Sequence, residues 1–165
     1  MKVINVQASN NQSFGTRYGS NLTKFLNTNK EILSNQNYKN ISRIRNNGIN
    51  SVLELEQASL KDIELNGYQY NLTLKGEVFD RKNTLISNQN EAYKDFQDYI
   101  AIKYKERPIS NKRFSIPVKR SDDTSRDIVK LFDDKNLLAE TIEKEYEQSK
   151  LVDKEYTEFI ARKKN

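Results

Sequence analysis

The residues with the clearest chemical potential are a carboxylate and a lysine two positions apart, in Asp80-Arg81-Lys82. Metal-dependent nucleases of one class place such a pair on one strand and a second acid on a neighbouring strand. There the carboxylates hold Mg²⁺ and the lysine supports the attacking water. Asp62 or Glu64 would supply the second acid from a preceding strand. A Mg²⁺-dependent nuclease is therefore one hypothesis, although a turn of solvated polar residues explains the triplet more simply.

The absence of two residue types limits the chemistry much further, because the chain contains no His and no Cys. This excludes Ser-His-Asp and Cys-His triads, Cys/His zinc sites, and haem or iron–sulfur ligation through these residues. The sequence also contains neither a Walker A motif nor Gly-x-Gly-x-x-Gly. We therefore expect no cofactor, no metal site and no enzymatic activity.

A basic block is the strongest candidate for binding. The net charge of the chain is +5, and residues 101–120 carry seven basic side chains against a single acid, Glu106. Basic residues interleaved with aromatic ones suit phosphate contacts combined with base stacking. A solubilising loop that pairs with the acidic segments is the alternative. The candidate nucleic-acid-binding residues are Lys103, Tyr104, Lys105, Arg107, Lys112, Arg113, Phe114, Lys119 and Arg120.

The elements that would position these residues begin with a polar stretch. Residues 1–20 have little hydrophobic periodicity, which predicts a flexible N-terminal arm. Leu22, Phe25 and Leu26 then follow helical spacing after Ser20, and a second short helix is expected over residues 38–45. The chain therefore starts with an arm and two helices.

The middle of the chain predicts an antiparallel β-meander. Asn66-Gly67 is a strong hairpin signal, because a type I′ turn needs positive φ at both central residues. It would join a strand over residues 61–65 to a strand over residues 68–74, whose apolar residues alternate. A second hairpin is expected over residues 77–87, with its turn at residues 81–83. Together these strands would form a sheet with one polar face.

Helical periodicity returns after the meander. Ala92, Phe96, Tyr99 and Ile100 predict a helix that covers the sheet. Residues 114–118 alternate as in a short strand, which Pro117 would confine to a sheet edge. From Asp123 the pattern is helical almost to the end, with a break near 133–136 or 149–153.

These patterns predict an α+β fold with N-terminal helices, a central antiparallel meander, a covering helix and a long C-terminal helix. We expect an arm over residues 1–20, an α+β domain over 21–120 and a C-terminal helical arm over 121–165. No apolar run is long enough to span a membrane, and no secretory signal is visible, so a cytoplasmic protein is expected. The abundance of Asn, Lys, Ile and Tyr indicates an AT-rich genome, bacterial or phage.

The expected function is that of a non-enzymatic protein-binding or regulatory module. A sheet edge, the N-terminal arm or the C-terminal helix would contact a protein partner or a second copy of the chain. A basic nucleic-acid-binding accessory protein acting through residues 103–120 is the alternative, followed by the nuclease.

Overall fold

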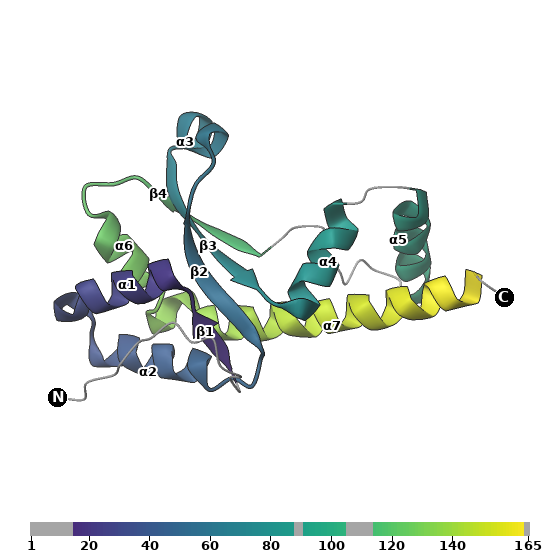
Figure 1. The fold of residues 1–165 in the computed structure, drawn as a ribbon, viewed down its shortest axis with the longest axis horizontal. Helices are drawn as coiled ribbons and strands as arrows, with labels where there is room; N and C mark the ends of the chain where they lie inside the picture. Colours follow the sequence, from purple (N-terminus) through teal and green to yellow (C-terminus); the bar gives the residue numbers. More distant parts are fainter. Residues whose placement is uncertain (1–14, 88–90, 105–113, 164–165) are drawn as a thin grey trace. The chain divides into compact units, whose positions relative to one another are not determined.

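The computed structural model describes residues 15–87, 91–104 and 114–163, and the chain folds into two compact units. The first, called here the sheet unit, comprises residues 1–75 and 115–143. The second, called the helical unit, comprises residues 76–114 and 144–165. The α+β class is confirmed, because the described residues form four strands and seven α-helices (Figure 1).

The sheet unit contains all four strands, and the long helix α7 contributes its first turns here and the rest to the helical unit. The elements of the sheet unit are β1 (Thr16–Tyr18), α1 (Ser20–Thr28), the 3₁₀ helix η1 (Lys30–Ile32), α2 (Asn35–Arg45), β2 (Ser51–Gln57), α3 (Leu60–Asn66), β3 (Tyr68–Lys75), β4 (Ser115–Lys119), α6 (Thr124–Lys130), η2 (Asp134–Asn136) and the start of α7 (Leu138–Lys163). Those of the helical unit are α4 (Glu77–Ser87), α5 (Glu91–Tyr104) and the remainder of α7.

The sheet has the strand order β1-β2-β3-β4. The pairs β2–β3 and β3–β4 are antiparallel, as expected for a meander, whereas β1 runs parallel to β2. Leu53 lies opposite Leu74 and Leu55 opposite Leu72, and all four side chains are buried, so one face of the sheet forms the core. The largest fully buried side chains of this unit are Tyr18, Leu22, Leu26, Ile41, Ile44, Leu53, Leu72, Ile128, Phe132 and Ile142.

Within residues 1–20, for which the sequence predicts a flexible arm, Thr16–Tyr18 form the strand β1 of the sheet. Thr16 is buried, and its hydroxyl lies 2.8 Å from the Ser51 hydroxyl of β2. The Asn47 side chain accepts a hydrogen bond from the Thr16 backbone N–H at 3.1 Å and donates one to its hydroxyl at 2.7 Å. These long-range bonds satisfy polar groups that local periodicity cannot assign to a strand. Residues 1–14 lie outside the described part of the chain.

The predicted strand over residues 61–65 is wrong, because this segment is the helix α3. The Ser59 side chain accepts a hydrogen bond from the Asp62 backbone N–H at 3.1 Å and caps its first turn. Gly67 follows in the left-handed conformation, with φ of 66°, and ends the helix. Asn66-Gly67 therefore terminates a helix, and β2 pairs with β3 across the inserted α3.

The second predicted hairpin is wrong for a similar reason, since residues 77–87 form the helix α4. Phe79 and Lys82 are buried on one side, and the half-buried Leu85 and Ile86 continue the same three- to four-residue spacing. Polar residues lie between them, and a run of polar residues also suits a turn. The helical period is hard to recognise in the sequence, because one buried position of this face is the aliphatic part of Lys82.

Other expectations are confirmed. Residues 68–75 and 115–119 are strands, and Pro117 lies on β4, an edge strand. The C-terminal helix α7 is continuous through residues 149–153, and the break before it is at residues 131–137.

The structure groups the chain differently from the expected division into residues 1–20, 21–120 and 121–165. The helix α5, expected to cover the sheet, belongs to the helical unit and packs on α7. Phe96, Ile100, Val152 and Phe159 form the buried cluster between them, and the Phe96 and Tyr156 rings meet edge to face at 5.2 Å. No helix in the described ranges is sufficiently long and apolar to cross a bilayer.

Candidate functional site

The short helix α3 exposes three apolar side chains, which we call the α3 knob. Leu60 is 76% exposed, Ile63 43% and Leu65 70%. Two other large hydrophobic residues are exposed in the described ranges. They are Ile102 on α5 and Leu137 before α7, and each is isolated from the α3 knob in the sequence. Scattered exposed apolar residues are ordinary, but a concentration on one seven-residue helix is typical of an interaction surface.

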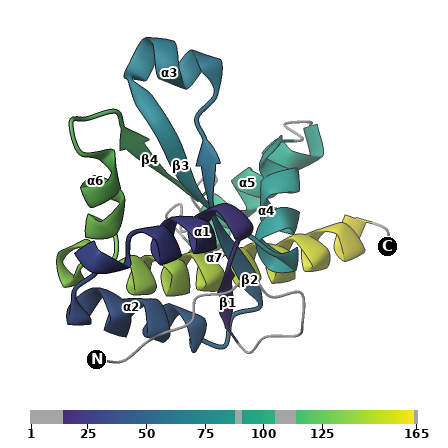
Figure 2. The same ribbon diagram turned by 60° about the vertical axis from the view of Figure 1, so that its left-hand side comes forward.

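The position of the α3 knob is set by the backbone at both ends of the helix. Before α3, the Ala58 N–H donates to the Gln69 carbonyl at 3.0 Å. After it, the Arg120 N–H donates to the Gly67 carbonyl at 2.9 Å. A helix of this length is unstable in isolation, so these bonds and its caps hold it in place. In both views α3 stands at the end of β2 and β3, clear of α1, α2 and α6 (Figures 1 and 2).

A groove lies between α1 and α6 in the same unit, and we call it the α1–α6 groove. It has about 1460 Å³ of unfilled space, part of it open to solvent. Leu55 and Ile128 are its buried apolar lining, and the half-buried rings of Phe25 and Tyr70 add to it. Lys24 is exposed on the rim and has no ion pair within the described part of the chain.

Both walls of the groove are fastened to the sheet. The Glu54 carboxylate of β2 accepts hydrogen bonds from the backbone N–H groups of Leu22 at 2.9 Å and Asn21 at 3.3 Å, so it caps α1. On the opposite wall, the Thr124 hydroxyl of α6 donates to the Gln69 side chain of β3 at 3.2 Å. The groove is therefore a preformed feature of the sheet unit.

The sheet edges are poorly suited to strand addition, which is one of the docking modes expected from the sequence. On β4, Pro117 has no backbone N–H to donate to an added strand. The other edge strand, β1, has three residues. Short edges and edge prolines are common protections against unwanted pairing. The α3 knob and the α1–α6 groove are better candidates for a contact surface.

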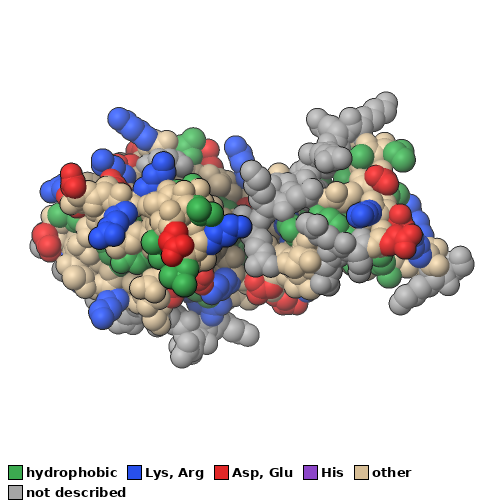
Figure 3. Space-filling model, turned by 90° about the horizontal axis from the view of Figure 1, so that it is seen from above, with side chains coloured by type: hydrophobic (Ala, Val, Ile, Leu, Met, Phe, Trp, Pro, Cys, Tyr) green, Lys and Arg blue, Asp and Glu red, His purple; other side chains and the backbone are tan. Residues whose placement is uncertain are grey.

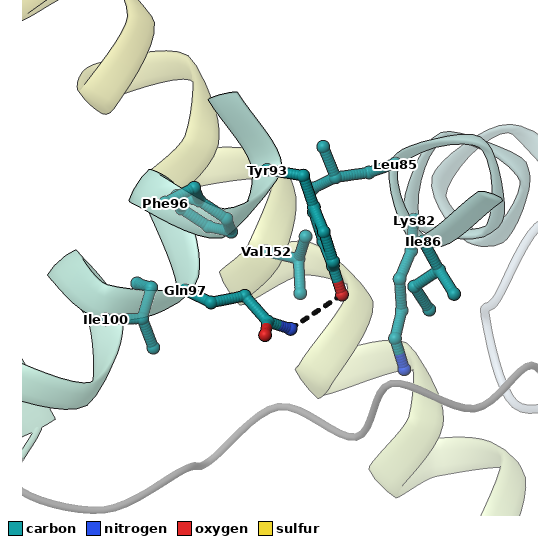
Figure 4. Close-up of a pocket in the computed structure, with 8 residues that line it drawn as sticks. All are labelled: Lys82, Leu85, Ile86, Tyr93, Phe96, Gln97, Ile100 and Val152. Atoms are coloured by element: carbon teal, nitrogen blue, oxygen red, sulfur yellow. Dashed lines mark hydrogen bonds between the residues drawn. The ribbon is translucent and has the colours of Figure 1, made fainter. Parts of the chain in front are cut away.

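In the helical unit, a narrow apolar pocket lies among α4, α5 and α7 (Figure 4). Lys82 lines it with its aliphatic chain, is 1% exposed, and places its ammonium nitrogen 2.9 Å from a Glu145 carboxylate oxygen. The Tyr93 hydroxyl accepts a hydrogen bond from the Gln97 amide at 2.7 Å, and burial raises the pKa of Tyr93. The Lys82–Glu145 pair fastens α4 to α7, so we assign it a structural role.

A second buried carboxylate joins α5 to α7. Glu155 is almost fully buried and accepts hydrogen bonds from the Lys103 ammonium at 2.8 and 2.9 Å and from the Tyr104 hydroxyl at 2.7 Å. Burial alone would raise the pKa of Glu155, but these two donors outweigh it and hold the pKa below its ordinary value. The bond to Glu155 raises the pKa of Lys103 and that of Tyr104.

This cluster predicts a pH dependence of the α5–α7 contact. A lowered carboxyl pKa gives stability that is present above the unfolded pKa and lost as pH falls through the folded pKa. The raised pKa of Lys103 has the opposite sign, so its contribution is lost only at strongly alkaline pH. We expect Glu155→Gln to reduce the loss of stability between neutral pH and pH 3, measured by urea unfolding. Parallel stability curves for the two proteins would contradict this role.

The predicted nucleic-acid-binding residues divide between the units. Lys103, Tyr104 and Phe114 belong to the helical unit, whereas Lys119 and Arg120 belong to the sheet unit. The Lys103 charge is paired with Glu155. The remaining candidates, Lys105, Arg107, Lys112 and Arg113, lie outside the described residues. Nucleic-acid binding through residues 103–120 therefore stays a prediction.

The strand geometry required by the nuclease hypothesis is not observed. Asp62 and Glu64 lie on α3, and Asp80 and Lys82 lie on α4, so none of them is on a strand. Asp80 is exposed whereas Lys82 is buried, because residues two apart point to nearly opposite sides of a helix. Within the described ranges, no group of three or more acidic side chains could hold a metal ion.

The α3 knob is not identified from the sequence, because residues 61–65 also fit a strand before an Asn-Gly turn. The signal that could have found it is the spacing of helix caps. Ser59 lies three residues before Asp62, and Asn66-Gly67 follows at the distance expected of a two-turn helix. Exposure of the leucines, however, depends on which elements fold over them.

Comparison with known proteins identifies no relative of this chain. No family model, no curated protein and no solved structure matches it. Its function must be inferred from the surfaces described above.

Proposed function

We propose that the protein is a non-enzymatic protein-binding module and that the α3 knob is its contact surface. The observation that carries this proposal is the exposure of Leu60, Ile63 and Leu65 on a helix that has no buried residue. Burying one such side chain stabilises a contact by roughly 1.5–3 kcal/mol, but in the isolated chain these side chains remain in water. A partner with an apolar cavity would bury them and gain this stabilisation.

The surroundings of the α3 knob support a protein partner. Lys61, Asp62 and Glu64 alternate with its apolar residues; Lys61 and Glu64 are exposed and Asp62 is half-buried. Leu60 and Ile63 are three residues apart and share one side of α3, and the charged side chains lie next to them. Apolar contacts bordered by polar ones are usual in protein interfaces. Figure 3 views the molecule from the side on which α3 projects in Figure 1, and hydrophobic side chains are visible there among charged ones.

The charged groups of the helical unit support a non-enzymatic role in a different way. Lys82 forms an ion pair with Glu145, and Lys103 forms one with Glu155. Catalytic acids and bases need access to substrate, whereas these pairs connect helices. We therefore place the function of the protein in surface contact.

A cross-linking experiment tests the proposal. Leu60 is replaced by the photo-reactive residue p-benzoylphenylalanine in cells that make the protein, and Ile102 is replaced in a second variant. Ile102 is the matched control because it is 80% exposed and is the exposed large hydrophobic residue among the described residues of the helical unit. We expect a discrete protein adduct from position 60 and none from position 102, detected by mass spectrometry.

A further substitution shows whether the adduct depends on the knob. Leu65→Asp should reduce the yield at position 60 by at least tenfold, because a charge in an apolar contact must be desolvated. The circular dichroism spectrum should be unchanged, since Leu65 is exposed. Equal adduct yields from positions 60 and 102, or insensitivity to Leu65→Asp, would refute the α3 knob as the contact surface.

A further inference from the structure

We infer that the partner of the α3 knob is a second copy of this chain, and that the knob enters the α1–α6 groove of that copy. This inference rests on the proposed function and gives it a specific occupant. Each copy has one knob and one groove, so reciprocal exchange would close a twofold dimer.

The lining of the groove and its opening to solvent suit a short helix. Part of its roughly 1460 Å³ of unfilled space is open to solvent, so a helix of a second molecule has access to it. With seven residues, α3 is about 10 Å long at 1.5 Å per residue. Leu55, Ile128 and the ring of Phe25 give the groove an apolar lining to meet the apolar side chains of α3.

Charge also matches between the two surfaces. Lys24 on the groove rim and Glu64 on α3 are both exposed, and neither has an ion pair within the residues that the structure describes. With Asp62 and Lys61, α3 has a net negative charge. The acidic residue of the groove lining, Glu56, is paired with Lys75, so Lys24 is the cation available to a negative helix. Docking α3 in the groove would place opposite charges near each other, which favours this pairing over contact between two α3 helices.

A copy cannot fill its own groove. The backbone hydrogen bonds of Ala58 and Gly67 hold α3 at the end of the sheet. The groove lies between α1 and α6 of the same unit, from which α3 stands clear in both views (Figures 1 and 2). The contact therefore requires a second molecule.

Two variants of the full chain test the α3 knob and the α1–α6 groove separately. In the knob variant, Leu60→Asp and Leu65→Asp place charges on α3. In the groove variant, Thr28→Trp fills the groove from an exposed position on its lining, so the fold is expected to be retained. Molar mass is measured by light scattering over a concentration series. We expect the natural sequence to dimerise and each variant alone to dimerise at least tenfold more weakly.

Mixing the two variants gives the decisive result. The groove variant retains an intact knob and the knob variant retains an intact groove, so an equimolar mixture should form a heterodimer with one of the two contacts.

A charge exchange between Lys24 and Glu64 adds a second measurement. Lys24→Glu should weaken dimerisation by up to about fivefold, the effect of a surface ion pair, and Glu64→Lys in the same chain should restore it.

The possible failures are distinguishable. If the groove variant dimerises as strongly as the natural sequence while the knob variant does not, α3 contacts another surface and this inference is wrong. If the natural sequence is monomeric at every concentration but position 60 still cross-links to a different protein, the second copy is excluded and the proposed function stands. If neither self-association nor an adduct is seen, both are wrong.

Discussion

Glu145→Ala is expected to destabilise the helical unit by about 3 kcal/mol. The substitution leaves the Lys82 ammonium, which is 1% exposed, without its partner. Breaking a buried ion pair from one side typically costs roughly 3–5 kcal/mol, because an uncompensated charge remains in a low-dielectric site. We place the effect at the lower end of this range because the Glu145 side chain is 14% exposed and solvent can replace part of it.

Hydrogen exchange measured by mass spectrometry would localise the effect, with faster exchange in α4 and unchanged exchange in β2 and β3. Asp153→Ala is the matched control, since Asp153 also lies on α7 and pairs with Arg81 of α4 at 3.0 Å, but on the surface. That variant should lose less than about 1 kcal/mol. Equal losses from the two variants would show that burial of the Lys82–Glu145 pair has no special importance.

Replacing both Lys82 and Glu145 by apolar residues shows whether the loss of stability comes from the unpaired charge or from the lost packing. In Lys82→Met with Glu145→Leu, apolar side chains of similar length occupy the site next to Leu85, Ile86 and Tyr93. Apolar replacement of a whole buried pair is often neutral or stabilising. We therefore expect the double variant to recover most of the stability lost in Glu145→Ala. A double variant as unstable as the single one would mean that the pair is needed for specific packing.

Gly15→Ala is expected to destabilise the sheet unit by about 3 kcal/mol, the upper end of the usual range for overpacking. A Cβ added to Gly15 would lie 1.7 Å from the backbone carbonyl oxygen of Arg45. No rotamer change relieves this clash, because both groups belong to the backbone. The β1 strand and the end of α2 would have to separate, which would also strain the hydrogen bonds between Thr16 and Asn47.

The matched control is Gly67→Ala, where an added Cβ meets nothing within 4 Å and only the left-handed φ of 66° is unfavourable. That conformation costs an L-residue about 1–2 kcal/mol. Urea unfolding followed by circular dichroism would compare the two variants. A Gly15→Ala protein more stable than Gly67→Ala would contradict the close approach of β1 and α2.

Local patterns in the sequence determined several elements correctly. Apolar alternation along residues 68–74 identified β3, and Pro117 placed residues 115–119 at an edge. Helical periodicity after Asp123 identified α6 and α7, with the break between them. These features follow from side-chain period and from the missing N–H of proline, which need no knowledge of distant residues.

Tertiary structure decided what local patterns left ambiguous. Asn66-Gly67 suits a type I′ hairpin and a helix end equally well, because both need a residue with positive φ. Only the pairing of β2 with β3 around α3 distinguishes the two. In the same way, β1 is a strand because residues about 35 positions later pair with it, and its own sequence is polar.

The chemistry of the chain shows the same division. Composition determined that His and Cys mechanisms are unavailable, since that conclusion depends on residue types alone. The partner of Lys82 lies 63 positions away, and the exposure of the α3 knob depends on which elements cover it. Burial and pairing are properties of surfaces brought together by folding. For that reason the sequence determined the α+β class and the excluded chemistries, and only the tertiary structure decided the candidate contact surface.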